Sequence, residues 1–497
     1  MIESSKMKSV IRSVFLPTLI YYAATCLVPN KISFIIVTLG YVAVLWRMTN
    51  DFRVALGASY IALSLFVIGK TFEIELISAR DLAIPWRPFG ISADVLVTFQ
   101  DAAVIGMALY IAFGIWQKTY QYTRNRLLEF LLFLYPVVTI IVTYIGSVRP
   151  EISFLHVLFT LRPIIVYYFF ASVPHFSVRR VWDVFAAGLC LEAAIVAGQM
   201  MRNGPLGLLI EPIYNYIVID KSYEVVQLIR YGGTYMHANA LAHGLLIPLT
   251  ALVPLLVYRY DRHGKRLVLC FVAGFAVLAV TMSRSAWISF GAGIGTFIVL
   301  AQYLWQYRVR FSYFLDVFGT WAAIACIFMF GVFVTPRIIS TIHTMDPYGS
   351  VETRVLLLRA YSEMIRTHPL FGVGLEMDVY TGYLQSLVRG DPKIDSPNRS
   401  VLQYFPEPVH NGLLRLMVQT GILATAVYIG VYAVIFRIAF IHMRRVRKVP
   451  ERLISLSLVC MVIVAFINSM MQPILPDVAL LAALTIIYTH TEAYEGI

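Results

Sequence analysis

The sequence predicts an all-α, polytopic membrane protein, and three observations carry this prediction. Hydrophobic residues make up 59% of the 497 residues and charged residues only 14%, whereas soluble domains carry roughly a quarter charged residues. The apolar runs are near 20 residues long, which is typical of transmembrane helices and not of the short alternating strands of a barrel. Basic residues recur in every second short loop, as they do on the cytoplasmic side of a membrane.

About fourteen apolar windows are expected to form spans. The basic N-terminal segment leads into the first of them without a small-x-small cleavage site, so we expect a retained helix rather than a signal peptide. The windows are residues 14–29, 32–47, 53–70, 93–116, 127–146, 152–172, 181–201, 237–258, 267–283, 285–305, 313–334, 412–441, 453–472 and 476–490.

The loop charges predict the orientation. A cytoplasmic N-terminus gives every short inner loop at least two Lys or Arg residues and leaves the short outer loops with fewer, as the positive-inside rule requires. Both termini are then cytoplasmic, and the long polar segments 71–92, 202–236 and 335–411 face outward, into the periplasm of a bacterium. Topology therefore explains the net charge of +12, and no basic stripe indicates nucleic-acid binding.

The predicted chain has three parts. Residues 1–334 hold eleven helices and the outer loops 71–92 and 202–236, residues 335–411 form one large outer loop with amphipathic helices, and residues 412–497 hold the last three helices. The five cysteines lie in apolar runs, without a CxxC pair or a His/Cys cluster. The sequence therefore predicts neither a disulfide framework nor a metal site.

Two charged residues fall near the middle of neighbouring spans. Arg162, which precedes the helix-kinking Pro163, and Glu192 lie at similar depth if their helices are antiparallel neighbours. Because an unpaired charge is costly in a membrane, the spacing predicts an ion pair between them. The pair is interpreted either as structural or as part of a substrate path. Asp101 lies nearer the outer end of its span.

Two arginines are predicted at the outer surface. Arg230 precedes two glycines in RYGGTYMHANA, where His237 and Asn239 start the next span, and a Gly-Gly bend beside a helix N-terminus suits a phosphate. Arg284 lies between two spans with almost no loop, and its rigid fork suits a phosphate or a carboxylate. The competing interpretations are an interfacial arginine at a helix entry for Arg230 and snorkelling to lipid headgroups for Arg284.

The longest polar segment in this otherwise apolar chain is residues 352–421. Arg354, Arg359 and Arg366 have helical spacing, with Leu357, Leu358, Tyr361 and Ile365 as the apolar stripe of an expected amphipathic helix on the outer interface. The segment FGVG follows as a tight turn, a weak signal by itself because no strand-turn-helix context surrounds it.

The same stretch ends in PEPVHNGLLRL. His410 and Asn411 immediately precede a long span, and Arg415 lies one turn inside it. A histidine on the outer face can act as a general base near neutral pH. A single histidine is usually structural, but this one shares a face of the membrane with several elements that carry arginines.

These motifs resemble the O-antigen ligase / O-antigen (Wzy-type) polymerase superfamily of bacterial envelope glycosyltransferases. The resemblance rests on the arginine-bearing helix, H-P-L-F-G-V-G and H-N-G-L-L-R-L with the later T-G, and extends more weakly to the Arg284 turn and to Arg230 before G-G-T. It implies a GT-C-like enzyme that moves a glycan from undecaprenyl pyrophosphate to an acceptor hydroxyl, without a metal or cofactor, at the outer face of the inner membrane.

The resemblance also implies the roles of single residues. His410 corresponds to the essential loop histidine, and Arg230 and Arg284 correspond to the arginines that hold the pyrophosphate. In the mechanism that follows from these roles, we expect Arg354, Asn411 and Arg415 to be supporting groups. Residues 335–411 are then the catalytic loop. The expected partners are the lipid-linked donor, a glycan or lipid A-core acceptor, the bilayer and a chain-length regulator.

Three functions remain open from the sequence. The number of spans and the total length favour a polysaccharide polymerase, which uses another lipid-linked glycan as acceptor. An O-antigen ligase, which transfers the glycan to lipid A-core or to protein, is the alternative. A lipid-linked oligosaccharide flippase belongs to another class and predicts short loops, unlike residues 335–411.

Overall fold

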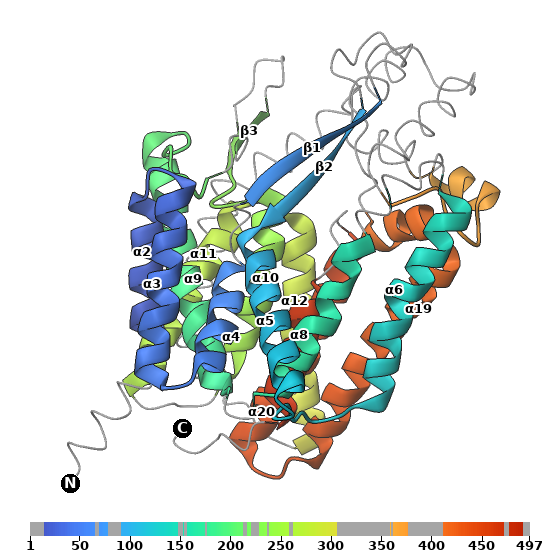
Figure 1. The fold of residues 1–497 in the computed structure, drawn as a ribbon. Helices are drawn as coiled ribbons and strands as arrows, with labels where there is room; N and C mark the ends of the chain where they lie inside the picture. Colours follow the sequence, from blue (N-terminus) through green and yellow to red (C-terminus); the bar gives the residue numbers. More distant parts are fainter. Residues whose placement is uncertain are drawn as a thin grey trace.

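The computed structural model describes helices that run side by side, with two β-hairpins at one end of the bundle (Figure 1). The described residues are 14–64, 69–77, 91–147, 153, 157–173, 176–211, 216–219, 228–235, 238–257, 262–305, 358, 361–375, 411–471 and 477–490. Their helices are α2 (Phe15–Leu27), α3 (Lys31–Thr49), α4 (Phe52–Leu63), α5 (Phe99–Trp116), α6 (Arg126–Gly146), the 3₁₀ helix η1 (Leu158–Leu161), α8 (Arg162–Ala171), α9 (Val178–Arg202), α10 (Ala238–Val257), α11 (Arg262–Val280), α12 (Arg284–Trp305), α19 (Gly412–Arg445), α20 (Val449–Ser469) and α21 (Val478–His490).

Seven of these helices are long and apolar enough to cross a membrane, namely α3, α5, α6, α9, α12, α19 and α20. Six further apolar stretches in the described residues are shorter, at 10–17 residues. This confirms a polytopic, helical membrane body. The predicted window 313–334 lies outside the described residues, and the total of about fourteen spans stays a prediction.

Two antiparallel hairpins are present: one lies within the predicted outer loop 202–236, and the other spans the predicted outer loop 71–92 and extends into the predicted spans on both sides. Strands β1 (Gly69–Ile77) and β2 (Ile91–Thr98) pair with Gly69 opposite Thr98, and β3 (Tyr216–Ile219) and β4 (Leu228–Tyr231) pair with Tyr216 opposite Tyr231. Both hairpins lie at the same end of the bundle, the upper end in Figure 1. We call it the loop-bearing end.

The hairpin between α4 and α5 corrects two predicted spans. The windows 53–70 and 93–116 each include residues that belong to strands, so the helices are shorter than the apolar runs. Thr98 and Asp101 form a capping box, in which the Thr98 hydroxyl accepts from the Asp101 amide and the Asp101 carboxylate accepts from the Thr98 amide. This reciprocal pairing starts α5 at Phe99, whereas hydrophobicity alone places its start six residues earlier.

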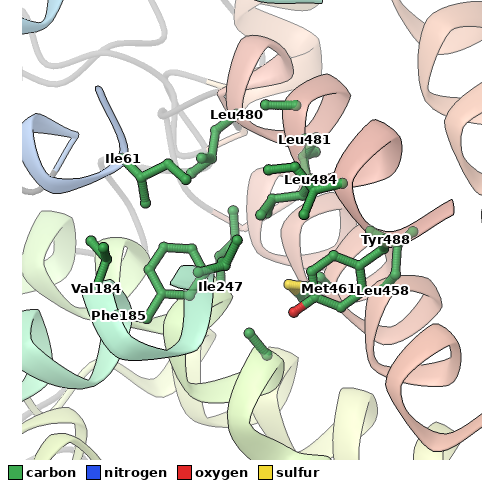
Figure 2. Close-up of a cluster of buried hydrophobic side chains, with 14 of the residues drawn as sticks. Ile61, Val184, Phe185, Ile247, Leu458, Met461, Leu480, Leu481, Leu484 and Tyr488 are labelled. Atoms are coloured by element: carbon green, nitrogen blue, oxygen red, sulfur yellow. The ribbon is translucent and has the colours of Figure 1, made fainter. Parts of the chain in front are cut away.

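The core lies where five helices meet. Figure 2 shows apolar side chains from α4, α9, α10, α20 and α21 pointing toward one another, and all of them are buried. Trp182 on α9 donates a hydrogen bond from Nε1 to the Tyr488 hydroxyl on α21, at 3.1 Å. The labelled residues are Ile61, Val184, Phe185, Ile247, Leu458, Met461, Leu480, Leu481, Leu484 and Tyr488.

The predicted ion pair between Arg162 and Glu192 is wrong. Arg162 pairs with Asp101 on α5, and Glu192 accepts hydrogen bonds from Thr234. The reason is that α8 and α9 are not antiparallel neighbours: α8 packs on α21 and α5, while α9 packs on α11 and α2. The 3₁₀-to-α change at Arg162 agrees with a kink at Pro163.

The close contact between α12 and α20 generates a test of the packing. A Cβ atom on Gly293 would lie 2.1 Å from Cγ2 of Val464, whereas a Cβ on Gly295 would meet nothing within 4 Å. We expect Gly293→Leu to destabilise the protein by about 1–3 kcal/mol through overpacking. Gly295→Leu, the matched control, leaves the melting temperature in detergent at or above the wild-type value. Equal melting temperatures for the two variants would contradict this packing.

Candidate functional site

The N-terminal part of α19 is broken from the rest of the helix at Gly421, whose φ of 69° and ψ of −178° are not helical. The break is filled by the turn of residues 369–374. Backbone N–H groups of Val373 and Gly374 donate to the carbonyl oxygens of Val418 and Gln419 at 2.9 and 3.0 Å. The N–H of Ile422 donates to the carbonyl oxygen of Pro369 at 2.9 Å. We call residues 369–374 the docked turn.

The hydrogen bonds replace those that the break removes. In a continuous helix the carbonyl of Val418 would accept from the N–H of Ile422, four residues later. Here both groups bond to the docked turn instead, and Val418 is buried. Buried backbone groups need partners, so the docked turn and the N-terminal part of α19 form one unit.

The contact between the docked turn and α19 requires a glycine in each of the two segments. A Cβ on Gly372 would lie 2.6 Å from the backbone of Gln419, and a Cβ on Gly421 would lie 2.2 Å from the carbonyl oxygen of Leu370. Both glycines also have φ of +69°, and the conformation of Gly421 is essentially restricted to glycine. Gly372 of H-P-L-F-G-V-G and Gly421 of T-G therefore allow the two backbones to approach each other closely.

The end of α6 closes the other side of the docked turn. A Cβ on Gly146 would lie 2.4 Å from Cβ of Phe371. The N–H of Leu375 donates to Oγ of Ser153 at 3.0 Å, and Ser153 is 2.9 Å from Oγ of Ser147. The docked turn is thus held between α6 and α19, which pack along their length (Figure 1).

The N-terminus of α19 follows directly from this unit. Asn411 caps the helix, and its side chain accepts from the N–H of Leu414 at 2.9 Å. Arg415 is half-buried one turn later, and its N–H donates to the carbonyl oxygen of Asn411. A helix N-terminus carries partial positive charge, and Arg415 adds a full one. His410 immediately precedes the cap in sequence and lies outside the described residues.

Hydrogen bonds from Thr281 and Trp287 to the last turn of α11 stabilise the Arg284 turn. Three residues separate α11 from α12, and Met282 among them has φ of +52°. The indole of Trp287 and the hydroxyl of Thr281 both donate to the carbonyl oxygen of Leu278, at 3.0 and 2.7 Å. Arg284 itself is exposed as the first residue of α12. An exposed arginine at a helix N-terminus favours an anion.

The Arg284 turn lies at the loop-bearing end. Helix α10 starts three residues after the turn that follows β4, and α10 and α11 each cross the bundle once before α12 begins. The backbone of Arg230 lies at the same end, on β4 opposite Ile217. The structure therefore brings Arg230, Arg284 and the N-terminus of α19 to one end of the bundle.

The amphipathic helix is only partly as predicted. Within residues 361–367 the buried side chains are Tyr361 and Met364, while Leu358 is 49% exposed rather than part of the buried stripe. Arg366 forms an exposed ion pair with Glu363 at 2.7 Å, and this hydrogen bond lowers the pKa of the Glu363 carboxyl. Arg354 lies outside the described residues.

The described residues contain no group of three or more His, Cys, Asp or Glu side chains arranged to hold a metal ion. The residues predicted to bind an anionic group are arginines.

Comparison with known families decides what this arrangement is. Residues 269–429 match the family model Wzy_C, described as O-antigen ligase. These residues are similar to an O-antigen ligase domain. The domain includes the Arg284 turn, the docked turn and the N-terminus of α19, so the resemblance predicted from the motifs is confirmed. Arg230 precedes it in the chain. No curated protein matches this chain.

The docked turn and the break in α19 both lie within the matched residues 269–429. Residues 369–374 and Gly421 are some 50 positions apart, yet both lie inside the O-antigen ligase domain and bond to each other. The sequence shows both glycine motifs but not their contact, because nothing in either motif specifies its partner.

A glycine substitution tests the docked turn. In Gly421→Ala the new Cβ meets the carbonyl of Leu370, so we expect the backbone bonds of the docked turn to open. Amide hydrogen exchange of peptides covering residues 369–374 should accelerate at least about tenfold, the factor for about 1.4 kcal/mol. Gly430→Ala on the same helix is the control, since its Cβ would make an ordinary 3.6 Å contact with Leu131. Unchanged exchange in Gly421→Ala would show that the docked turn does not depend on this glycine.

Proposed function

We propose that the protein is a polysaccharide polymerase of the bacterial inner membrane. It transfers a glycan from undecaprenyl pyrophosphate to a hydroxyl of another lipid-linked glycan. The observation that carries the proposal is the O-antigen ligase domain at residues 269–429, because it joins the Arg284 turn to the segment that ends in His410 and Asn411. The apolar helices supply the membrane body that a polyprenyl donor requires.

The leaving group sets the role of the arginines. When the bond between the anomeric carbon and the phosphate oxygen breaks, negative charge develops on the pyrophosphate. Arg230 and Arg284 bind the pyrophosphate and stabilise that charge, work that fixed cations perform well in a site that excludes water. The charge remains on the undecaprenyl pyrophosphate that departs.

His410 acts on the acceptor. It takes the proton of the attacking hydroxyl as the oxygen forms its bond to the anomeric carbon. Attack from the face opposite the pyrophosphate inverts the configuration at that carbon. Asn411, which caps α19, and Arg415 hold the end of the helix that follows His410, and Arg354 supports the loop or a phosphate. Residues 335–411 are the catalytic loop, on the periplasmic side, with both termini in the cytoplasm.

The ligase remains the second candidate, because the matching family is described as O-antigen ligase. Deleting the gene and separating the envelope polysaccharide on a gel distinguishes the two. Single repeat units on the acceptor indicate a polymerase. Loss of all attached polymer, with long chains still on the lipid carrier, indicates a ligase. The domain match favours glycan transfer over the flippase alternative.

The proposed roles predict a graded loss of transfer by purified protein supplied with a polyprenyl-pyrophosphate glycan. His410→Ala should lower the rate by about 10²–10⁴-fold, the usual contribution of a general base. Arg284→Ala should lower it by about 10²-fold or more through lost charge stabilisation. Arg366→Ala is the control, since this arginine is exposed and paired with Glu363, and its rate should stay within about twofold. Full transfer by His410→Ala would remove the proposed base.

A further inference from the structure

Two polar side chains of α9 form hydrogen bonds to the turn that follows Arg230. Glu192 and Gln199 are seven residues apart, two helical turns, and therefore share one face of the helix. Their exposed fractions are 0% and 1%. Each bonds one residue of the pair Gly233–Thr234, which comes just after β4.

Glu192 uses both carboxylate oxygens on one residue. Oε2 accepts from the backbone N–H of Thr234 at 3.1 Å, and Oε1 accepts from the Thr234 hydroxyl. A buried carboxylate is costly unless its oxygens are hydrogen-bonded. Glu192 therefore stabilises the one backbone arrangement that brings both Thr234 groups to it.

Gln199 bonds the preceding residue in the manner of a neighbouring strand. Its Oε1 accepts from the N–H of Gly233 at 3.1 Å, and its Nε2 donates to the carbonyl oxygen of Gly233 at 3.1 Å. The same Nε2 also donates to Oε1 of Glu211 at 2.7 Å. Glu211 in turn accepts from the N–H groups of Leu206 and Leu208 at 3.0 and 2.9 Å. Both ends of the outer segment after α9 are thus tied to one helix.

The contact with Glu192 leaves no room for a side chain at position 233. Its φ is +59°, and a Cβ there would lie 2.2 Å from Oε2 of Glu192. Arg230 lies three positions earlier on β4, where the ladder pairs it with Ile217. The backbone that carries Arg230 is therefore held by the ladder on one side and by the α9 side chains on the other.

We propose that Glu192 and Gln199 are positioning residues for Arg230. They fix its backbone before the donor binds, so that the backbone at Arg230 needs no further ordering when the pyrophosphate binds. The inference rests on the proposed function, in which Arg230 binds that pyrophosphate. Glu192 acts on Arg230 through its two hydrogen bonds to Thr234. A glutamine at this position can keep two bonds, its amide oxygen accepting from the Thr234 N–H and its amide N–H donating to the Thr234 hydroxyl.

Steady-state transfer by the full-length protein in lipid, measured against the concentration of a polyprenyl-pyrophosphate glycan, tests the inference. Glu192→Leu and Gln199→Leu should each raise the donor KM at least about tenfold, with the acceptor KM unchanged. Glu192→Gln should restore the donor KM to within about threefold of wild type, because it keeps both bonds to Thr234. Should Glu192→Leu fail to fold, Thr234→Val, which removes the hydroxyl bond to Glu192, should also raise the donor KM.

A double-mutant cycle separates positioning from general stability. Because Glu192 acts through Arg230, Glu192→Leu should change the donor KM less than about twofold in an Arg230→Ala background. The matched control is Asp183→Leu, which removes another buried carboxylate of α9, one that pairs with Arg266 at 3.2 Å. It should lower the melting temperature and leave the donor KM unchanged.

The outcomes divide cleanly. Three results would each overturn the positioning role and leave the proposed function standing. They are independent, multiplying effects of Glu192→Leu and Arg230→Ala, an unchanged donor KM in the leucine variants, and a Glu192→Gln variant as impaired as Glu192→Leu. Arg230→Ala with wild-type kinetics would overturn both this inference and the pyrophosphate role of Arg230.

Discussion

The backbone contact between the docked turn and the break in α19 is the constraint on which the outer site depends. A helix interrupted at Gly421 inside an apolar body leaves carbonyl and amide groups without their intrahelical partners, and such groups are costly where water cannot reach them. The docked turn supplies those partners from its own backbone. Because the bonds join backbone to backbone, side chains in the turn can vary, but Gly372 and Gly421 cannot acquire a Cβ without separating the two segments.

A second contact that uses backbone groups, on the other side of the bundle, has the same physical basis. The turn after β4 bonds through the backbone of Gly233 and Thr234 to two buried side chains of α9. In both places a segment at the loop-bearing end is attached to a helix of the bundle by directed hydrogen bonds and by a glycine with positive φ. We therefore view the site as two halves, the arginine turns and the α19 unit, each held at the loop-bearing end by the membrane body.

Sequence reasoning predicted what depends on local composition and missed what depends on contact. Hydropathy predicted α6 to within one residue at its start, because an apolar run between Asn125 and Ser147 leaves little choice. It misplaced α5, since the boundary is decided by the Thr98–Asp101 capping box and not by hydrophobicity. It paired Arg162 with Glu192 because neighbours in sequence were assumed to be neighbours in space, whereas Arg162 pairs with Asp101. The motif H-P-L-F-G-V-G was recognised, but its partner Gly421 becomes visible only in three dimensions.

The most direct test of the account is a structure of the purified protein in lipid with a non-hydrolysable polyprenyl-diphosphate glycan. The account predicts the two phosphates within about 3 Å of the guanidinium groups of Arg230 and Arg284. It also predicts the His410 side chain on the opposite face of the anomeric carbon, beside the N-terminus of α19. A diphosphate bound away from both arginines, or a His410 side chain turned away from the sugar, would contradict the central claim.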